Sequence, residues 1–447
     1  MDFENIYLRL PLFFQNLLIN LKGLLIRRSR YNKSFFKYLD LYESNLKLRL
    51  ETPNDELYCF LKFAANSAYW SKVFEKNNFN INANNIFEEL KKLPILDKNI
   101  VKDNLKDICL SVNNDKINST HTSGTTGSGL VFPQTRTMEN KQWAIWWRYR
   151  KMHGIQLDDW CGWFGGRSIV PIKQKKPPYW RTCYPLKQVM FSAHHLNNIT
   201  VKDYFIEIKE RKLEWLHGYP SQLSYFANLI KDANLGKLPD LKIITVGAEN
   251  LLEHQKDVIQ NVFNVPVRQH YGLAEGVANI SEWTDDSLRV DKDFSYVEFV
   301  PIDNDNNNFF KIIGTNFNNY AFPLIRYDTG DIAEIERMDN GEYKIVSIDG
   351  RKEDLILLPN GVKLGRLDHI FKDIVNVSEA QLYQPDRSKV IIRIVKGQNY
   401  QETKDKNKII KEVRKRLGNE INLELVYYDN IPKTRSGKLR FVISDIK

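Results

Sequence analysis

The stretch His121-Thr122-Ser123-Gly124-Thr125-Thr126-Gly127-Ser128-Gly129-Leu130 holds three glycines, five Ser/Thr residues and no charged side chain. This composition disfavours helix and strand interiors, because glycine loses the most backbone freedom on folding and hydroxyls compete for backbone partners. It favours a loop around an anion, since glycines let successive N–H groups converge on a phosphate. The stretch lacks the Lys that follows the last Gly of a P-loop. A flexible Ser/Gly linker has the same composition, so both interpretations stay open at this point.

The composition of the chain is that of a globular protein with more than one domain. It has 447 residues, of which 42% are hydrophobic, 12% aromatic and 27% charged. A single core rarely grows beyond about 250–300 residues, so two or more domains are expected. The net charge of +10 suits anionic small ligands, nucleic acid or an anionic membrane surface without choosing among them. The four cysteines lack CxxC or CxxH spacing, which argues against a zinc site or a disulfide framework and favours the cytoplasm.

The N-terminal segment needs a separate test for membrane contact. Residues 6–26 are rich in Leu, Ile and Phe but are interrupted by charged and polar residues, so no uncharged run is long enough to cross a bilayer. From Pro11 onward, apolar residues cover much of a helical circumference, and Arg27, Arg28 and Arg30 follow. The pattern is compatible with a helix lying on anionic lipid and with a helix packed on its own domain.

The middle of the chain alternates strand and helix patterns, which predicts βα units and a largely parallel sheet. The clearest unit leads from a strand through the turn Gly247-Ala248-Glu249 into a helix, and the next strand leads into His270-Tyr271-Gly272. The expected bounds are 242–246 for the first strand, 252–263 for the helix and 265–269 for the second strand. Open α/β sheets bind ligands beyond the carboxyl ends of their strands, so the two turns should flank a ligand.

The remaining segments predict helices before residue 150 and a β-rich region after residue 290. Asp97 is the expected N-cap of one helix, and Trp143, Trp146 and Trp147 lie at helical spacing, where core packing is favoured over an aromatic pocket. The expected strands are 296–301, 309–314, 331–336, 343–348, 380–384, 389–396 and 422–428, with a helix over 401–417. The fold class is therefore α/β, with a large N-terminal domain of mainly parallel sheets and a β-rich subdomain, followed by a small α+β C-terminal domain.

Three further clusters carry candidate ligand-binding groups. Residues 327–331 place a carboxylate at a Gly turn, where it can accept both hydroxyls of a ribose, and residues 350–356 contain an arginine that can hold a phosphate. The segment 431–440 alone resembles a basic tail for nucleic acid or a membrane. Taken singly, each cluster is also compatible with an ordinary surface turn.

Five segments in this order resemble the adenylate-forming (AMP-binding) superfamily of acyl–coenzyme A synthetases, peptide-synthetase adenylation domains and luciferases. They are residues 122–130, 271–275, 327–331, 350–356 and 432–438, which match the phosphate loop, the Tyr-Gly-x-x-Glu and Tyr-x-Thr-Gly-Asp elements, the hinge and the Pro-Lys-Thr-x-Ser-Gly-Lys element. Residues 10–16, 93–98, 247–249 and 323–328 are similar to the phenylacetate–coenzyme A ligase branch, especially to relatives found with capsule and surface-polysaccharide genes.

The resemblance implies an acid–thiol ligase that forms an acyl-adenylate from ATP and a small carboxylic acid, releases pyrophosphate, and transfers the acyl group to coenzyme A. It implies an ATP- and acid-binding domain over 1–349 and a mobile domain over 350–447 that turns about Glu353. Transfer to a carrier protein or an amino sugar is the nearest alternative. A non-catalytic nucleotide- or nucleic-acid-binding protein is a remote one, and the oligomeric state is left open.

The resemblance also implies roles for individual residues. The expected catalytic residues are Lys438, Glu275 and Arg351, with Glu275 also binding Mg²⁺ and Lys433 as an inactive neighbour. The expected ATP-binding residues are Ser123, Gly124, Thr125, Thr126, Gly127, Gly247, Ala248, Glu249, His270, Tyr271, Gly272, Asp331 and Arg351. The expected neighbours of the acid, which suggest an aryl or medium-sized acyl group, are Trp143, Trp163, Phe164, His217 and Tyr219.

The chain departs from the superfamily pattern in three places. Gly129-Leu130 stands where many relatives have Pro-Lys, which removes a positive charge near the β and γ phosphates. Ala274 stands where Thr is usual before the Glu, so one hydroxyl near the phosphate and the metal is missing. No Cys follows Cys183, which argues against the structural zinc site of some relatives.

Overall fold

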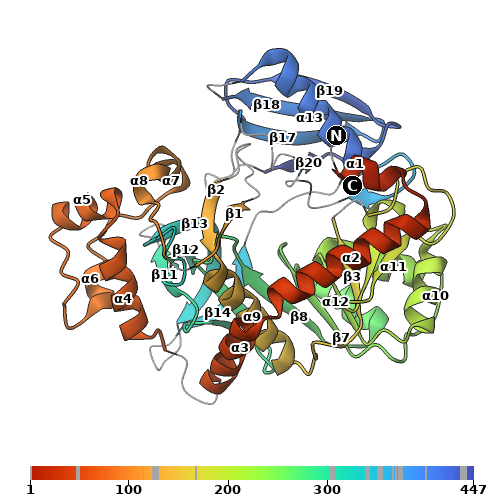
Figure 1. The fold of residues 1–447 in the computed structure, drawn as a ribbon. Helices are drawn as coiled ribbons and strands as arrows, with labels where there is room; N and C mark the ends of the chain where they lie inside the picture. The colour runs from red at the N-terminus through yellow and green to blue at the C-terminus, as the bar shows by residue number, and fades with distance from the viewer. Residues whose placement is uncertain are drawn as a thin grey trace.

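The fold is described from a computed structural model of the chain (Figure 1). The described residues are 3–46, 51–113, 115–122, 130–166, 169–302, 308–337, 343–349, 356–364, 367, 370, 376–397, 400–432 and 440–446. Within them, no helix is both long and apolar enough to cross a membrane.

Helices dominate the first third of the chain and cover the sheet later. They are α1 (Phe3–Arg9), α2 (Leu12–Arg30), α3 (Lys33–Asn45), α4 (Asn54–Ala64), α5 (Ala68–Lys76), α6 (Ile86–Leu90), α7 (Lys98–Asp103), α8 (Leu105–Ile108), α9 (Arg136–Met152), α10 (Val201–Glu210), α11 (Pro220–Asp232), α12 (Glu253–Phe263) and α13 (Glu402–Leu417), with a short 3₁₀ turn η1 (Ala193–His195). Asp97 caps α7 as predicted, because its carboxylate accepts from the backbone N–H groups of Asn99 at 2.8 Å and Ile100 at 2.9 Å.

The strands of the large domain form a hairpin and one long mixed sheet. They are β1 (Ile117–His121), β2 (Val131–Thr135), β3 (Cys161–Gly165), β4 (Trp180–Cys183), β5 (Gln188–Ser192), β6 (Trp215–Gly218), β7 (Ile243–Gly247), β8 (Val267–Gly272), β9 (Asn279–Glu282), β10 (Leu288–Val290), β11 (Tyr296–Pro301), β12 (Phe309–Thr315), β13 (Tyr327–Arg337) and β14 (Tyr343–Asp349). The described sheet has twelve strands in the order β11-β12-β13-β14-β10-β9-β8-β7-β6-β3-β5-β4. The β-rich part is thus continuous with the parallel part.

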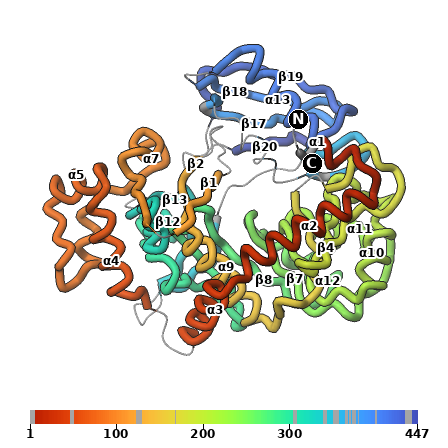
Figure 2. Tube along the Cα trace, viewed as in Figure 1, coloured from red at the N-terminus to blue at the C-terminus, as the bar shows by residue number. Residues whose placement is uncertain are grey.

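The parallel part of this sheet is the predicted βα region. Strands β5, β3, β6, β7 and β8 run parallel to one another. At the two ends of this part, β4 pairs antiparallel with β5 and β9 pairs antiparallel with β8. One face packs into a core with α10, α11 and α12, and the other packs against α9 and α3 (Figure 2). Because parallel strands end at the same edge, β7 and β8 present their carboxyl ends side by side, as the two predicted turns require.

The C-terminal part has its own sheet and its own core. Its strands are β15 (Ile356–Leu357), β16 (Lys363–Leu364), β17 (Val377–Asp386), β18 (Lys389–Lys396), β19 (Asn422–Tyr427) and β20 (Val442–Ser444), and the sheet order is β19-β18-β17-β20. Ile392, Ile394, Ile409 and Val413 belong to a buried cluster formed almost wholly by residues from 356 onward. In Figure 1 this sheet lies above the large domain.

Local patterns located the elements well and their ends less well. The expected strands 296–301 and 389–396 match β11 and β18, and the predicted fold class is confirmed. Strand β8 continues to Gly272, so His270 and Tyr271 lie in a strand rather than in a turn. The extension arises because β9 pairs with these residues, a long-range contact that no local pattern contains. Trp147 is buried in the core, as expected.

Candidate functional site

The described part of the candidate site is centred on Tyr271 and Asp331. Tyr271 lies near the end of β8 and Asp331 lies in β13, sixty residues further along the chain. The Tyr271 hydroxyl donates a hydrogen bond of 2.8 Å to the Asp331 carboxylate. Burial, and then the charge of Asp331, hold the pKa of Tyr271 well above its usual value, so the phenol remains a donor. Two segments that the sequence linked only by resemblance therefore meet in the fold.

A bulge within β13, where the sequence predicted a Gly turn, fixes the orientation of Asp331. The Asp328 carboxylate accepts from the backbone N–H of Gly330 at 2.8 Å, and Gly330 has a φ of 69°, which favours glycine. The Thr329 hydroxyl donates to the backbone oxygen of Ile312 at 2.9 Å and accepts from the N–H of Asp331 at 3.0 Å. The side chains of Asp328 and Thr329 thus hold this bulge, and the Asp331 carboxylate accepts from the Tyr271 hydroxyl.

The turn after β7 approaches the same strand end. Ala248 has a φ of 66°, a left-handed conformation that costs a non-glycine residue about 1–2 kcal/mol. A Cβ at Gly247 would lie 3.2 Å from the backbone oxygen of His270, so the two strand ends are close together. The Glu249 carboxylate accepts from the N–H of Ser221 at 3.2 Å, in the first turn of α11. Backbone strain of this kind clusters at ligand sites, which fits the expected contact of this turn with the adenine.

His270 is a fixed, neutral member of the site. Its Nε2 lies 2.8 Å from Oδ1 of Asn279, which also accepts from the indole of Trp146 at 3.1 Å. The amide nitrogen of Asn279 donates to Asp291 at 2.5 Å, so its oxygen is the acceptor and His270 must carry its proton on Nε2. Burial, the main cause, lowers the pKa of His270 to about 4. The ring is therefore uncharged at pH 7.

Glu275 follows β8 and is buried near Tyr271. Its side chain is 7% exposed, and its charge contributes to the raised pKa of Tyr271. Its backbone oxygen accepts from the amide of Asn316 at 2.9 Å. Within the described residues, no group of three or more His, Cys, Asp or Glu side chains could hold a metal ion. A Mg²⁺ bound by Glu275 would take its other oxygen ligands from phosphates and water, as is usual for this ion.

The base of the expected phosphate loop is a closed hairpin. Strands β1 and β2 pair antiparallel, and Thr122 continues the pairing by donating its N–H to the Leu130 oxygen at 2.9 Å. The Thr122 hydroxyl accepts from the Leu130 N–H at 2.9 Å. The predicted loop residues Ser123, Gly124, Thr125, Thr126 and Gly127, together with Arg351, Glu353, Lys433 and Lys438, lie outside the described residues.

The expected acid-binding residues fall into two groups. Trp163 in β3 and His217 in β6 are paired neighbours with ring centroids 4.7 Å apart, and Trp143 packs against the same cluster. The prediction for Phe164 is wrong, because its ring stacks on Phe191 in the core on the opposite face of the sheet. Successive side chains of a strand point to opposite faces, so Trp163 and Phe164 cannot line the same pocket.

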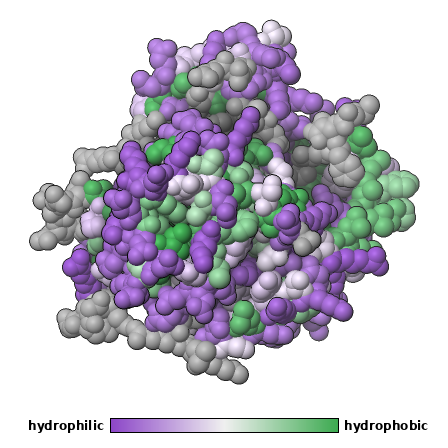
Figure 3. Space-filling view, turned by 60° about the vertical axis from the view of Figure 1, so that its left-hand side comes forward, coloured by the Kyte–Doolittle hydropathy of each residue, from purple (hydrophilic) through white to green (hydrophobic). Residues whose placement is uncertain are grey.

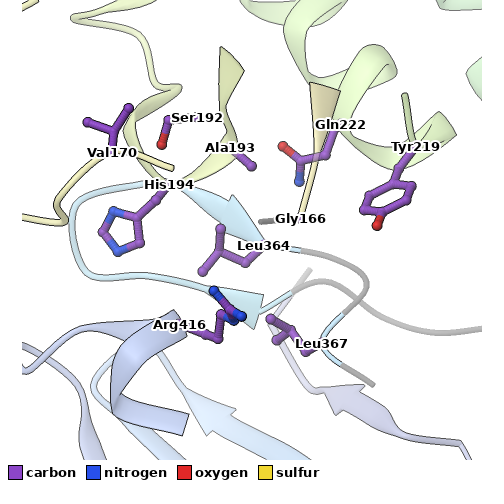
Figure 4. A pocket seen from close by; sticks show the side chains of 10 residues that line it. All are labelled: Gly166, Val170, Ser192, Ala193, His194, Tyr219, Gln222, Leu364, Leu367 and Arg416. Atoms are coloured by element: carbon purple, nitrogen blue, oxygen red, sulfur yellow. The ribbon is translucent and has the colours of Figure 1, made fainter. Parts of the chain in front are cut away.

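Tyr219 lies instead at a small cavity where the C-terminal part meets the large domain (Figure 4). The cavity is lined by Gly166, Val170, Ser192, Ala193, His194, Tyr219, Gln222, Leu364, Leu367 and Arg416. In Figure 4, Leu364, Leu367 and Arg416 face the residues of the large domain across the cavity. Nearby, the Tyr225 hydroxyl donates to the backbone oxygen of Gly361 at 2.8 Å. The two parts of the chain therefore meet beside one of the expected acid-binding residues.

The sequence motifs did not single out two buried arginines of α9, Arg148 and Arg150. Arg148 is 2% exposed and bonds to Asp291 and Asp293, each at 2.6 Å. Arg150 is 9% exposed and lies over the rings of Trp147 and Trp215. The sequence does place two arginines in a helix rich in tryptophan, which is a sign of a buried charge. It does not show which face of that helix is buried.

Comparison with known proteins decides the family. The chain is 30% identical over 458 residues to Protein CapK from Staphylococcus aureus, and the match covers 99% of each protein. The chain belongs to the CapK family. The model of the CapK C-terminal domain matches residues 359–445 of this CapK-family chain, the region that holds the separate C-terminal sheet.

Solved structures show the fold of this CapK-family protein. A 2-hydroxyisobutyryl-CoA ligase, in complex with 2-HIB-AMP and CoA in the thioesterification state, matches 88% of each chain at 17% identity with a TM-score of 0.54. The same ligase with R3-HIB-AMP in the postadenylation state matches with a TM-score of 0.51 at 16% identity, over 88% of this chain and 89% of that one. The CapK-family chain therefore has the fold of the adenylate-forming superfamily, as its motifs indicated.

Proposed function

We propose that this chain activates a small carboxylic acid with ATP and transfers the acyl group to coenzyme A. The contact between Tyr271 and Asp331 carries the proposal, because it joins a strand end suited to a purine with a carboxylate suited to a ribose. The strained turn at Ala248 follows the neighbouring strand β7, and the solved structures of similar fold contain acyl-adenylates. A nucleotide would be held between these three features.

The chemistry starts from the low reactivity of a carboxylate, which is anionic and has no good leaving group. One carboxylate oxygen attacks the α-phosphorus of ATP, the bond to the bridging oxygen breaks, and pyrophosphate leaves. The thiol then attacks the carbonyl carbon of the adenylate, loses its proton, and AMP leaves. Both steps gather negative charge, so positioned cations and N–H donors supply most of the catalysis.

Each expected residue has a defined task in this proposal. The Tyr271 ring and the turn 247–249 hold the adenine, and Asp331 accepts the ribose hydroxyls. Glu275 would hold Mg²⁺, and the ion would offset the charge of the phosphates. The loop residues 123–127 hold the β and γ phosphates, and Arg351 a ribose oxygen or the phosphate. Lys438 reaches the α-phosphate and the substrate carboxylate, and residues 350–447 turn about Glu353 between the two steps.

Pyrophosphate release across a panel of carboxylic acids, with and without coenzyme A, tests the proposal. Tyr271→Phe removes a hydrogen bond to a charged group, about 1.5 kcal/mol, so the KM for ATP should rise about tenfold. Asp331→Asn should raise this KM by at least as much. Tyr343→Phe is the matched control, because Tyr343 is exposed on β14.

Mass spectrometry of the product identifies the acceptor. The proposal expects a coenzyme A thioester when the protein is supplied with coenzyme A, a holo-carrier protein and amino sugars together. A carrier-bound or sugar-bound acyl group would keep the first step and replace the second. No acid-dependent exchange of pyrophosphate into ATP across the whole panel would refute the function. ATP and coenzyme A as substrates would place the protein in the cytoplasm.

A further inference from the structure

Arg150 is a buried cation to which the described residues offer no anion. It lies in α9 and is 9% exposed, and its guanidinium makes no hydrogen bond or ion pair with the described part of the chain. Its Cζ lies 4.9 Å from the ring centroid of Trp147 and 5.3 Å from that of Trp215. Contact with aromatic faces offsets only part of the cost of removing a charge from water. A complementary anion would offset the remainder.

The surroundings of Arg150 are electropositive. Burial, the largest cause, lowers the pKa of Arg150, and the charge of Arg30 lowers it further. Arg30 itself lies over Trp143, with its Cζ 3.4 Å from the ring centroid. The other titratable groups near Arg150 are Tyr31, Tyr149, Cys161, His217 and His270, none of which is a carboxylate. Burial raises the pKa of Tyr149 and of Cys161 and lowers the pKa of the two histidines. Arg30 and Arg150 thus share a cage of tryptophan rings formed by Trp143, Trp147 and Trp215.

The cage adjoins the expected acid-binding residues. Trp215 and His217 alternate along β6 on the same face of the sheet, and His217 pairs with Trp163. Burial first, and then the charge of Arg150, hold the pKa of His217 well below its usual value. We propose that the substrate acid carries a second oxyanion group, a carboxylate or a phosphate, which Arg150 binds while the aromatic side chains enclose the part between the two acidic groups. This inference rests on the proposed function.

Matched pairs of acids test the inference: butyrate with glutarate, and benzoate with isophthalate. In the unaltered protein, kcat/KM should be at least thirtyfold higher for the diacid of each pair, glutarate or isophthalate, than for the monoacid. Arg150→Gln should lose most of that preference while sparing the first member, and Arg150→Lys should retain part of it. Equal use of both members, or a preference that Arg150→Gln leaves unchanged, would overturn the inference. Calorimetric binding of glutarate to the folded variants gives a second readout, in which Arg150→Gln should weaken binding at least tenfold. If no acid supports pyrophosphate release while glutarate still binds through Arg150, the proposed function fails and the anion site stands.

A second inference concerns α2, which turns its polar side toward the rest of the protein. Gln15 accepts two hydrogen bonds from Arg181, at 2.8 Å and 2.6 Å. Asn20 donates to the backbone oxygen of Thr182 at 3.0 Å, and Arg27 donates to that of Pro185 at 2.8 Å. The helix also approaches β4 closely, since a Cβ at Gly23 would lie only 2.4 Å from the sulfur of Cys183. These polar contacts fix the rotation of α2.

The opposite side of α2 is apolar and exposed. Its exposed large hydrophobic residues are Phe13 at 71%, Phe14 at 49%, Leu17 at 45%, Leu21 at 49%, Leu24 at 47% and Leu25 at 68%. At 3.6 residues per turn these positions share an arc of about 120°. Helix α2 crosses the front of the molecule in Figure 1. In the rotated view of Figure 3 this front lies at the right-hand side, and the surface there is green, which marks hydrophobic residues. A helix of a globular protein normally has the reverse polarity, so this face requires an apolar partner outside the fold.

The charges around α2 identify that partner. Residues 5–39 contain seven Lys or Arg and no Asp or Glu. An apolar helix face bordered by cations fits a bilayer with anionic headgroups, in which the side chains enter the interface and the cations remain near the phosphates. A second copy of this chain would instead bring like charges together. We propose that α2 docks the protein on an anionic membrane surface, with its axis in the plane of the bilayer.

Co-sedimentation with vesicles tests this docking. The protein should bind vesicles of phosphatidylcholine with phosphatidylglycerol at least tenfold more tightly than vesicles of phosphatidylcholine alone. Phe13→Ser combined with Leu25→Ser should reduce that binding at least tenfold, and Arg28→Glu should reduce it at low salt. Ile199→Ser is the control, because Ile199 is 84% exposed elsewhere, before α10. Absence of binding, or binding that the double variant retains, would overturn the proposal. If the protein does not bind vesicles but forms a dimer in light scattering, and the double variant is monomeric, the partner of α2 would instead be a second copy of the chain.

Discussion

Replacing Arg148 by methionine should destabilise the large domain strongly. The side chain joins three segments, since it bonds to Asp291 and Asp293 beyond β10 and to the backbone oxygen of Tyr42 in α3 at 3.3 Å. Asp291 also accepts from Asn279, which holds His270, so the ion pair supports one side of the candidate site. Arg148→Met keeps much of the side-chain volume while removing the charge.

The magnitude follows from burial. Arg148 and its two carboxylate partners are 2%, 2% and 6% exposed, so water cannot replace the lost cation. Removing one partner of a buried ion pair typically costs about 3–5 kcal/mol, compared with a total stability of about 5–15 kcal/mol for a domain. Burial already raises the pKa of Asp293, and loss of Arg148 should raise it further. A raised carboxyl pKa favours the folded state at low pH, so the deficit should shrink between pH 7 and pH 5.

Urea unfolding, followed by the fluorescence of the tryptophans in α9, measures the effect. Lys242→Met is the matched control, because Lys242 pairs with Glu214 on the surface at 2.8 Å with 69% and 45% of the side chains exposed. That variant should change the free energy of unfolding by less than about 1 kcal/mol. Adding Asp291→Asn and Asp293→Asn to Arg148→Met should recover much of the loss. A loss below about 1 kcal/mol for Arg148→Met, or a deficit independent of pH, would refute the reasoning.

Three further predictions concern the site. Ala248→Gly should stabilise the fold by up to about 1 kcal/mol in thermal unfolding, because the φ of Ala248 is 66°. It should also weaken ATP binding, because glycine makes the turn less rigid. An unchanged unfolding midpoint and an unchanged KM for ATP would contradict this prediction. Gly218→Val should lower the yield of folded protein, since even a Cβ would lie 2.4 Å from the backbone oxygen of Phe164; normal folding and activity would argue against this packing. Lys438→Ala should slow pyrophosphate release by raising its activation free energy by at least about 3–4 kcal/mol, whereas Lys433→Ala should have little effect. Equal effects of the two substitutions would refute the assignment of Lys438.

The sequence could predict features that depend on neighbouring residues. Hydrophobic alternation gave the positions of strands such as β11 and β18, and side-chain chemistry gave the cap at Asp97. The motifs around Tyr271 and Asp331 were recognisable because turn and ligand chemistry is local in sequence. Strand ends were less accurate, as with β8, because its last residues are held by pairing with β9.

Only the tertiary structure decided which side chains meet. The hydrogen bond between Tyr271 and Asp331 spans sixty residues and depends on where their strands lie in the sheet. The core position of Phe164, the charge of Arg150 within an aromatic cage and the outward apolar side of α2 likewise depend on packing. A sequence fixes the alternation of faces along each element, but the direction in which a face points is set by contacts with segments that are distant in the chain. The sequence therefore determined which motifs the chain carries, and the fold determined which of their side chains are brought together.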